Sequence, residues 1–284
     1  MARRATRKAK GKGKGPLAIG VIGAGNMATA LLKGWLNAGL YRPEQVWASD
    51  IEASKRNAAR RQFRIATTAN NEEMVRGSKV LVLAVKPQTM DAVLAVMRPA
   101  VTSAHLFISI AAGVPTGRLE AALGNRARVL RVMPNTPALL GKGMSVLVRG
   151  RYATAADEKL GVRLLRAVGE AVAVPDERLL DAVTGLSGSG PAYLYLMAEG
   201  LIAGGVQAGL PAPLATRLAL QTITGAAAML QDTGETPEGL RAMVTSPGGT
   251  TLAGLGELHR RGFKDALIAA VVSATRRSEE LGRS

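Results

Sequence analysis

The sequence predicts two domains in succession, an α/β domain and an all-helical domain after it. Short apolar runs alternate with helical segments as far as about residue 177, which is typical of a doubly wound, mostly parallel sheet. A glycine-rich loop directly follows the first apolar run and opens a helix. Beyond that point the pattern is helical throughout, broken by glycine and proline.

In the first half of the chain, strands are predicted at short apolar runs bounded by polar residues or by glycine and proline. Such runs need no alternation, because helices cover both faces of a parallel sheet. Helices are expected between them, the first from the glycine loop to about residue 38 and another over 87–97. The predicted strands are 17–22, 46–49, 80–85, 106–110, 129–133, 144–148 and 171–174.

The second half is predicted to consist of helices alone. The first of them, 192–208, is apolar over a long stretch, but Glu199 and three glycines interrupt it. This pattern favours a buried or subunit-interface helix over a membrane span. The other predicted helices are 213–231, 237–244, 252–261 and 264–281.

The composition narrows the function classes. The 284 residues include no cysteine, which removes disulfides, thiol nucleophiles and thiolate metal sites, and which suits a reducing, cytoplasmic location. Neither of the two histidines, His105 and His259, belongs to a cluster with metal-ligand spacing, so no metal site is expected. Only 3% of the residues are aromatic, so basic patches interleaved with aromatic residues are absent.

The formal net charge is +16, of which +7 lies in the first fifteen residues and +9 is spread over the rest of the chain. Residues 1–15 contain Arg and Lys at seven positions and no acidic residue. This tail has no apolar face and no following apolar segment, so we expect it to be disordered and not a secretory signal. It is interpreted as a solubilising extension, with an arm that contacts phosphate or acidic surfaces as the alternative.

The segment GAGNMA at 23–28 fits the fingerprint of a loop that binds a dinucleotide pyrophosphate. Gly23 allows the turn, Gly25 lets the pyrophosphate approach the backbone, and Ala28 permits close packing of helix on strand. The loop follows a strand and opens a helix, as the motif requires. A purely structural turn is the alternative.

The end of the second predicted strand bears on the choice of cofactor. Asp50 would suit the ribose hydroxyls of NAD, whereas Ser49 with Lys55 and Arg56 would suit the 2′-phosphate of NADP. The residues themselves leave both cofactors open.

Two further loops follow predicted parallel strands, and the carboxyl ends of such strands form the ligand crevice. The first is AVKP at 84–87 and the second AAG at 111–113, so both are expected to line the cofactor. An exposed charge at a strand end is the alternative for Lys86. The rigid segment MPNTP at 133–137 could close the same crevice.

The segment SPGGTT at 246–251 combines turn residues, three hydroxyls and a following helix. Such a turn directs several backbone N–H groups, with the positive end of a helix dipole behind them, toward a small anion such as a carboxylate. A threonine at the helix start is expected to act as its cap. A tight turn that merely caps a helix is the alternative.

Familiar catalytic machinery is missing from the sequence. The segment GLSGSG at 185–190 resembles a nucleophile elbow, but Ser189 stands where that pattern needs glycine, which argues against a serine hydrolase. A nicotinamide cofactor without a metal or a histidine base favours hydride transfer to an already electrophilic acceptor, such as a C=N bond.

Six motifs resemble, in family order, those of the pyrroline-5-carboxylate reductases. Each motif alone is weakly specific, whereas the six together are highly specific. The resemblance extends from Leu17 to Leu281, so that only the basic tail falls outside it. The motifs are IGVIGAGNMA at 19–28, AVKP at 84–87, SIAAGV at 109–114, MPNTPA at 133–138, GLSGSGPAY at 185–193 and SPGGTT at 246–251.

The resemblance implies reduction of L-1-pyrroline-5-carboxylate to L-proline, the last step of proline synthesis, with NADPH or NADH as hydride donor. It implies a Rossmann-like NAD(P)-binding domain over 16–177. It also implies a helical dimerisation and substrate domain over 178–284, in which the helices of two subunits interlock. Such homodimers often assemble into decamers, so the substrate site is expected where subunits meet.

Carried over by position, the resemblance also implies roles for individual residues. Thr251 is the expected catalytic residue, which hydrogen-bonds the ring nitrogen of the substrate as proton donor or as orienter. The residues expected to bind substrate are Glu177, Ser246, Gly248, Gly249, Thr250 and Thr251. The residues expected to bind the cofactor are Gly23, Ala24, Gly25, Asn26, Met27, Ala28, Ser49, Asn71, Ala84, Val85, Lys86, Pro87, Ala111, Ala112 and Gly113.

The chain departs from the family pattern at two positions. Met243 stands where some relatives have a polar residue near the cofactor. Asp50 stands in a strand-end region that often carries Ser or Pro, and it bears on the preference for NADPH.

Two rival functions are distinguishable by simple assays. Another imine or 2-oxo-acid reductase of similar build would reduce a different cyclic imine and leave pyrroline-5-carboxylate untouched. A nucleic-acid-binding protein would show salt-sensitive DNA binding that disappears when residues 1–15 are removed. Nothing beyond the tail supports the second rival.

Overall fold

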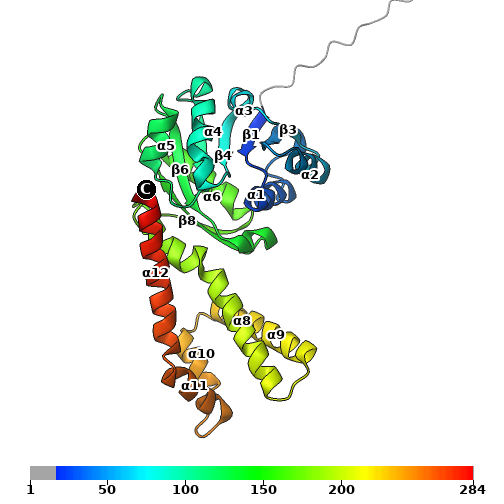
Figure 1. Cartoon of the computed structure of the whole chain (residues 1–284), viewed down its shortest axis with the longest axis vertical. Coiled ribbons are helices and arrows are strands. Elements are labelled where there is room, and N and C mark those ends of the chain that lie inside the picture. Colours follow the sequence, from blue (N-terminus) through cyan, green and yellow to red (C-terminus); the bar gives the residue numbers. More distant parts are fainter. Residues whose placement is uncertain (1–16, 284) are drawn as a thin grey trace, which may run out of the picture. The chain divides into compact units, whose positions relative to one another are not determined.

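The computed structural model describes residues 17–283, and it divides after Glu177 into two compact units (Figure 1). The predicted fold class is confirmed, since an α/β unit precedes an all-helical one. The basic tail over 1–15 lies outside the described residues.

The first unit is built on one sheet with the strand order β3-β2-β1-β4-β5-β6-β7-β8. All neighbouring strands are parallel except β6 and β7, which are antiparallel. In this order the chain adds β2 and β3 on one side of β1, then crosses over and adds β4 and the later strands on the other side. Ligands of such sheets bind at the carboxyl ends of the strands where this switch occurs. The strands are β1 Leu17–Ile22, β2 Val46–Ser49, β3 Ala66–Thr68, β4 Ser78–Leu83, β5 Leu106–Ser109, β6 Arg128–Met133, β7 Gly143–Arg149 and β8 Gly169–Ala173.

Two hydrophobic cores form on the sheet, one on each face. The first joins β1, β2 and β6 to apolar residues of α1, α2 and α6, among them the fully buried Trp35 and Leu164. The second packs α3, α4 and α5 on the sheet through side chains such as Met74, Met90 and Leu119. The helices are α1 Asn26–Asn37, α2 Ala53–Phe63, α3 Asn71–Gly77, α4 Met90–Met97, α5 Thr116–Leu123 and α6 Ala155–Arg166.

Both tryptophans of the chain are buried in this unit, and both indole N–H groups donate a hydrogen bond. Trp35 Nε1 donates to the carbonyl of Leu164 at 2.9 Å, which ties α1 to α6. Trp47 Nε1 donates to the hydroxyl of Ser78 at 2.6 Å, which ties β2 to the start of β4. A buried indole needs such a partner, because an unpaired buried donor costs free energy.

The sequence missed β3, a three-residue edge strand whose Ala66 is exposed and whose neighbours are half-buried. Such a strand has no continuous apolar run, so the pattern used for the buried strands does not detect it. The strand predicted at 80–85 is observed at Ser78–Leu83, so it begins and ends two residues earlier than predicted.

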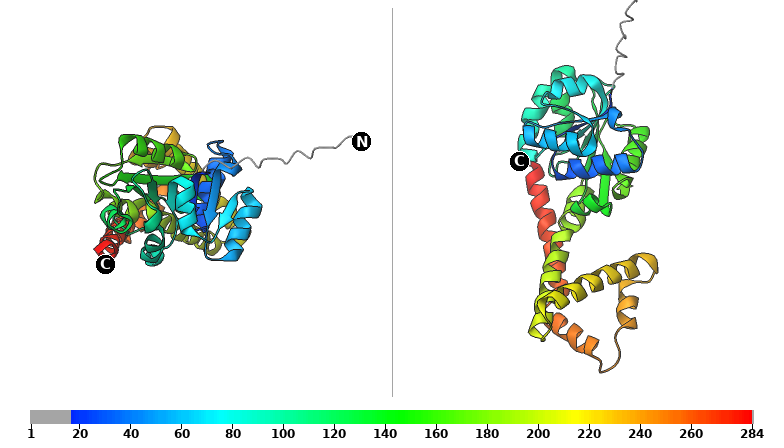
Figure 2. Two further views of the ribbon diagram at one scale, coloured as in Figure 1. Left: turned by 90° about the horizontal axis from the view of Figure 1, so that it is seen from above. Right: turned by 90° about the vertical axis from the view of Figure 1, so that its right-hand side faces the viewer.

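The second unit contains only helices, among which α8 and α9 pack together next to the short turn that joins them (Figure 2). Gly205 lies close to Ala215 at that crossing. No helix of the described residues is long and apolar enough to span a membrane. The helices are α7 Leu179–Val183, α8 Gly190–Gln207, α9 Ala212–Asp232, α10 Pro237–Met243, α11 Thr250–Arg260 and α12 Phe263–Arg283.

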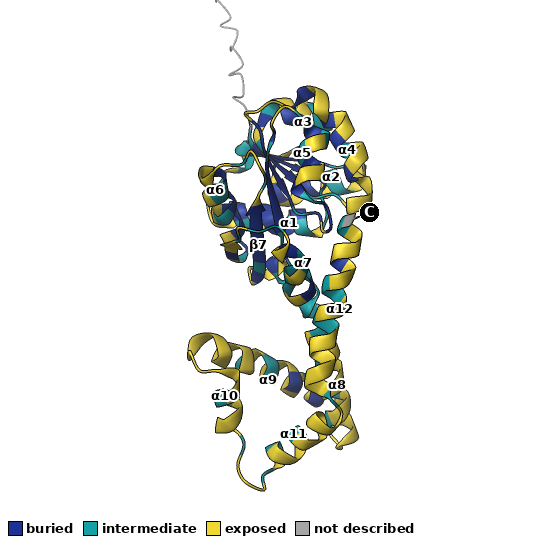
Figure 3. Ribbon diagram, turned by 90° about the vertical axis from the view of Figure 1, so that its left-hand side faces the viewer, coloured by how far each residue is buried: buried dark blue, intermediate teal, exposed yellow. Residues whose placement is uncertain are grey.

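Few residues of this helical unit are buried within the single chain. Figure 3 shows the contrast with the sheet unit, whose interior is coloured as buried while α8 to α11 are mostly coloured as exposed. Helix α8 contains no buried residue, and side chains as large as Leu196 and Met243 are about 70% exposed. Among the unit's described residues only Leu180, Gly185, Ala215, Ala219 and Ser278 are buried.

The GLSGSG segment is helical and lies between α7 and α8, as a single-turn π-helix over Thr184–Gly188. A Cβ added at Gly185 would lie 2.3 Å from the hydroxyl of Thr275 and 2.6 Å from the carbonyl of Val271, both on α12. Tyr193 donates its hydroxyl to the carbonyls of Gly185 and Ala270, at 3.2 and 3.4 Å. The glycine therefore serves close packing of this segment on α12.

Candidate cofactor crevice and anion-binding turn

The strand register aligns several predicted loops at one edge of the sheet. Ile22 pairs with Ser49 of β2 and with Leu83 of β4, and Leu83 pairs with Ser109 of β5. The loops after these strands therefore begin side by side. Backbone hydrogen bonds join them, from Gly23 to Ser49 at 2.8 Å and from Ile110 to Leu83 at 3.1 Å.

Gly23 makes the turn at the end of β1 with φ of +96°, which strongly favours glycine. A Cβ at this position would lie 2.6 Å from the carbonyl oxygen of Ala84. The glycine is therefore required twice, by the turn and by the contact with the neighbouring loop.

Gly25 is the N-cap of α1, and no side chain caps this helix. The N–H groups of Asn26, Met27 and Ala28 consequently have no intrahelical partner. A Cβ at Gly25 would meet no protein atom within 4 Å, so the space in front of these donors is open. A helix start of this kind fits a dinucleotide pyrophosphate.

Two residues predicted to lie near the adenosine end of the cofactor meet at the end of β2. Ser49 is buried and donates its hydroxyl to Oδ1 of Asn71 at 2.6 Å, so the two predicted residues lie together but bond to each other. Asp50 instead lies against the glycine loop, since the N–H of Ala24 donates to its Oδ2 at 2.9 Å. The sequence analysis considered Asp50 only as a partner of the cofactor ribose and did not predict this contact with the loop.

The AVKP and AAG loops bring backbone and small side chains to the same edge. Ala84 and Val85 are half-buried, whereas Lys86 and Pro87 are exposed. Ala111 and Gly113 are buried around an exposed Ala112, and Gly113 turns the chain with φ of +71°. The two loops follow the neighbouring strands β4 and β5, and β4 lies next to β1 and its glycine loop.

Glu177, expected beside the substrate, is held within the first unit by three hydrogen bonds. Thr116 donates its N–H and its hydroxyl to the two carboxylate oxygens, at 2.8 and 2.6 Å. The buried guanidinium of Arg131 on β6 donates at 2.8 Å. Thr116 lies three residues after Gly113, the last residue of the AAG loop, so Glu177 ties the end of the first unit to the segment that follows this loop. Sequence reasoning missed the roles of Thr116 and Arg131.

Burial raises the pKa of Glu177, but the hydrogen bonds from Thr116 and Arg131 outweigh burial and hold the pKa below its ordinary value. The unfolded chain has a glutamate pKa of about 4.3. Because the folded-state pKa is the lower one, the carboxylate stabilises the first unit above that pH. The stabilisation is lost as pH falls through the folded-state pKa.

Replacing Glu177 with glutamine is therefore expected to lower the free energy of unfolding at pH 7 by about 1–3 kcal/mol, because the buried Arg131 loses its charged partner. The difference between variant and wild type should shrink as pH falls below about 4. Urea unfolding at several pH values measures it. Glu170→Gln, at an exposed position on β8, is the matched control, and an equal loss in both variants would contradict the assignment.

The SPGGTT turn belongs to the second unit and is built around a hydrogen bond from the N–H of Gly249 to the carbonyl of Ser246, at 3.0 Å. Gly248 has φ of +69°. The prediction that a threonine caps the helix is wrong, because Gly249 is the N-cap and no side chain caps α11. Thr250 and Thr251 are instead the first two helical residues. In the part of the chain that the structure describes, no hydrogen bond engages their hydroxyls or that of Ser246.

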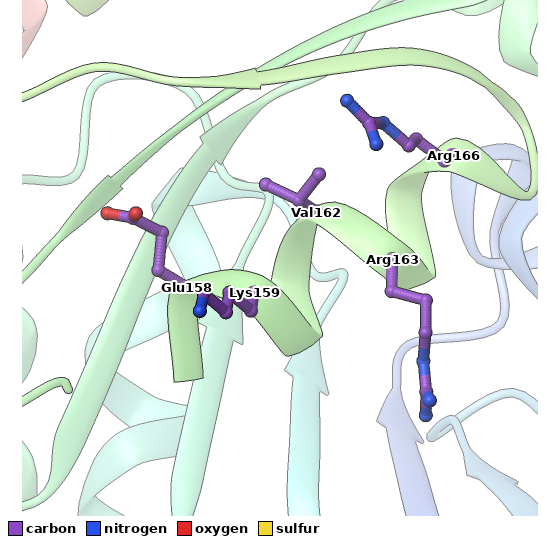
Figure 4. Close-up of a pocket in the computed structure, with 5 residues that line it drawn as sticks. All are labelled: Glu158, Lys159, Val162, Arg163 and Arg166. Carbon is purple, nitrogen blue, oxygen red and sulfur yellow. The ribbon is translucent and has the colours of Figure 1, made fainter. Parts of the chain in front are cut away.

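One surface depression of the first unit lies away from these loops, along α6 (Figure 4). It is lined by Glu158, Lys159, Val162, Arg163 and Arg166. Arg163 and Arg166 extend in different directions, and Glu158 pairs with Arg149 at 3.0 Å. Its charged side chains do not converge on one point, so the candidate site remains the carboxyl edge of the sheet.

Two family models match the chain. The model described as pyrroline-5-carboxylate reductase dimerisation matches residues 177–281. The model described as NADP oxidoreductase, coenzyme F420-dependent, matches residues 18–113.

Individual relatives match nearly the whole chain. A pyrroline-5-carboxylate reductase of Methanosarcina acetivorans is 44% identical over 93% of this chain and 98% of its own. One from Glycine max is 43% identical over 93% and 95%. Among solved structures, a reductase of this name from Coxiella burnetii superposes with a TM-score of 0.88 at 33% identity, covering 95% and 100%. One from Plasmodium falciparum, with NADP bound, gives 0.84 at 32%, covering 94% and 98%.

Proposed function

Because the chain belongs to the pyrroline-5-carboxylate reductase family, we propose which of its residues bind the cofactor and which bind the substrate in the reaction of that family. The reaction is the reduction of L-1-pyrroline-5-carboxylate to L-proline, the last step of proline synthesis, with NADPH or NADH as donor. We assign cofactor binding to residues 16–177 and substrate binding with dimerisation to 178–284.

One observation carries the assignment of the two binding sites. Helices α1 and α11 both begin with a glycine N-cap in extended conformation, and no side chain caps either helix. Each helix start therefore leaves backbone N–H groups for an anion. We assign the start of α1 to the cofactor pyrophosphate and the start of α11 to the substrate carboxylate.

The crevice at the carboxyl edge then orients the nicotinamide half of the cofactor. Bound there, the cofactor supplies a hydride from C4 of its nicotinamide ring. The backbone of 84–87 and 111–113 holds that ring, and Glu177 positions the second loop through Thr116 instead of touching substrate. Because a C=N bond is already electrophilic, alignment of donor and acceptor is the main contribution of the protein.

At the second site the amides of Gly249 to Thr251 and the hydroxyl of Ser246 anchor the substrate carboxylate. The Thr251 hydroxyl makes no hydrogen bond within residues 17–283. It gives its proton to the ring nitrogen as the hydride reaches the imine carbon, and water returns a proton to the hydroxyl. A carboxylate anchor on a rigid helix start fixes the five-membered ring without large side chains.

The direct test is oxidation of NADPH and of NADH with pyrroline-5-carboxylate as acceptor, with proline identified as product. Turnover with formation of proline is the expected result. A folded protein that reduces only other cyclic imines would overturn the substrate assignment.

We also propose that the chain works as a cytoplasmic homodimer that assembles further into decamers. The second unit supports the dimer, since its helices bury few side chains within one chain and expose residues such as Leu196 and Leu194. Exposed apolar helix faces of this extent are typical of obligate interfaces.

Replacing Leu196 with arginine is expected to dissociate the oligomer and lower its melting temperature, because a charge cannot be buried unpaired in such an interface. Sedimentation velocity measures the assembly state. Val96→Arg on α4, at a position 55% exposed in the first unit, is the matched control and should leave the assembly intact. An unchanged sedimentation coefficient in Leu196→Arg would contradict the role of α8.

A further inference from the structure

Arg131 is a charged residue within a buried strand of the sheet. It lies on β6, opposite Ser109 of β5 and Val148 of β7, and its side chain is only 7% exposed. Its neighbours Leu130 and Val132 belong to the first hydrophobic core. Replacing a buried ion pair with apolar side chains is often neutral or stabilising, so packing alone does not account for an arginine at this position.

The guanidinium of Arg131 pairs with Glu177, and Glu177 in turn caps the start of α5. Arg131 Nη1 donates to Oε1 of Glu177 at 2.8 Å, and the same oxygen accepts the N–H of Thr116, also at 2.8 Å. Pro115 is the N-cap residue of α5 and makes no side-chain cap. The carboxylate of Glu177 therefore stabilises this helix start, and Arg131 holds the carboxylate in place.

The loop 111–113 is fixed on both sides. Before the loop, the N–H of Ile110 donates to the carbonyl of Leu83 in the neighbouring strand, at 3.1 Å. After the loop, Thr116 is bound to Glu177 through its N–H and through its hydroxyl, the latter at 2.6 Å. Only residues 111–115 separate these two points, so the position of the α5 start determines where the loop lies.

We propose that Arg131 is a positioning residue for hydride transfer, which acts through Glu177 and Thr116 on the loop 111–113. The inference rests on the proposed function, in which the backbone of this loop holds the nicotinamide ring. The pyrophosphate is assigned to the start of α1 and does not depend on Arg131. Loss of Arg131 should therefore disturb the alignment of hydride donor and acceptor more than the affinity for the cofactor.

Hydrogen exchange of the full chain without cofactor, followed by mass spectrometry, tests the structural part of the inference. In Arg131→Gln the amides of residues 110–117 are expected to exchange about tenfold faster, because the capping carboxylate loses its charged partner. Arg128→Gln is the matched control. Arg128 lies on the same strand and pairs with Asp157 at 2.7 Å, but it stands opposite Leu106, at the other end of β5. Exchange over 110–117 should be unchanged in this control.

Steady-state kinetics with pyrroline-5-carboxylate and calorimetry with NADPH test the functional part. Arg131→Gln is expected to lower kcat by about ten- to a hundredfold, while the dissociation constant of NADPH rises by less than about threefold. Arg128→Gln also loses a partly buried ion pair, and it should leave kcat unchanged. A purely structural role of Arg131 would predict the same kinetic behaviour in both variants.

Three results would overturn the inference: unchanged exchange over 110–117 in Arg131→Gln, unchanged kcat in that variant, or an equal loss of kcat in Arg128→Gln. If Arg131→Gln fails to fold, Thr116→Val decides. It removes only the hydroxyl bond to Glu177 and should lower kcat by about fivefold, whereas an unchanged kcat would contradict the inference.

Failure of the proposed reaction is distinguishable from failure of this inference. A wild-type chain that forms no proline would refute the reaction. The exchange measurement uses neither cofactor nor substrate, so it decides independently whether Arg131 holds the loop.

Discussion

Replacing Gly25 with alanine is expected to weaken the binding of NADPH by about ten- to a hundredfold while leaving the fold nearly unchanged. The added methyl meets no protein atom within 4 Å, and the backbone is extended there, so the substitution costs at most about 1 kcal/mol at a helix N-cap. The same methyl points into the space in front of the free N–H groups of α1, where the pyrophosphate must approach the backbone. Quenching or enhancement of NADPH fluorescence measures the affinity, and thermal unfolding measures the fold.

Gly23→Ala is the comparison that separates the two effects. At Gly23 the added methyl meets the carbonyl of Ala84 and the backbone has positive φ, so both stability and affinity should fall. An unchanged affinity for NADPH in Gly25→Ala would show that the pyrophosphate does not bind at this loop.

Replacing Thr251 with alanine is expected to lower kcat for pyrroline-5-carboxylate by about ten- to a hundredfold, the contribution of one positioned proton donor. The start of α11 retains its backbone donors, so KM should change little. Thr251→Ser keeps a hydroxyl and should recover most of the rate. Steady-state kinetics at saturating NADPH measures both parameters.

A raised KM with unchanged kcat in Thr251→Ala would instead mark the residue as one that only binds substrate. Loss of rate in Thr251→Ser equal to that in Thr251→Ala would show that the hydroxyl is not the active group.

The order of elements and the crevice were predictable because their signals are local. The buried strands are continuous apolar runs, and the glycine loop must stand between the first strand and its helix. The edge strand β3 was not predictable in this way, because Ala66–Thr68 is short and only partly buried.

The partners of individual side chains were not predictable because they depend on contacts between residues far apart in sequence. Glu177 bonds to Thr116 and Arg131, which are 61 and 46 positions away. The hydroxyl of Ser49 donates to Asn71, which lies 22 positions further along the chain. The motifs predict where the candidate site lies, whereas tertiary contacts determine which of its atoms are engaged in hydrogen bonds within the chain.

The placement of the two tryptophans has a spectroscopic consequence. Trp35 and Trp47 are both buried in the sheet unit, and the chain contains no other tryptophan. Indole emission therefore reports the unfolding of the sheet unit alone, while far-UV circular dichroism reports helices of both units. Coincident transitions will mean that the units unfold together. An earlier dichroism transition will mean that the helical unit melts first, with the emission spectrum still that of buried indole.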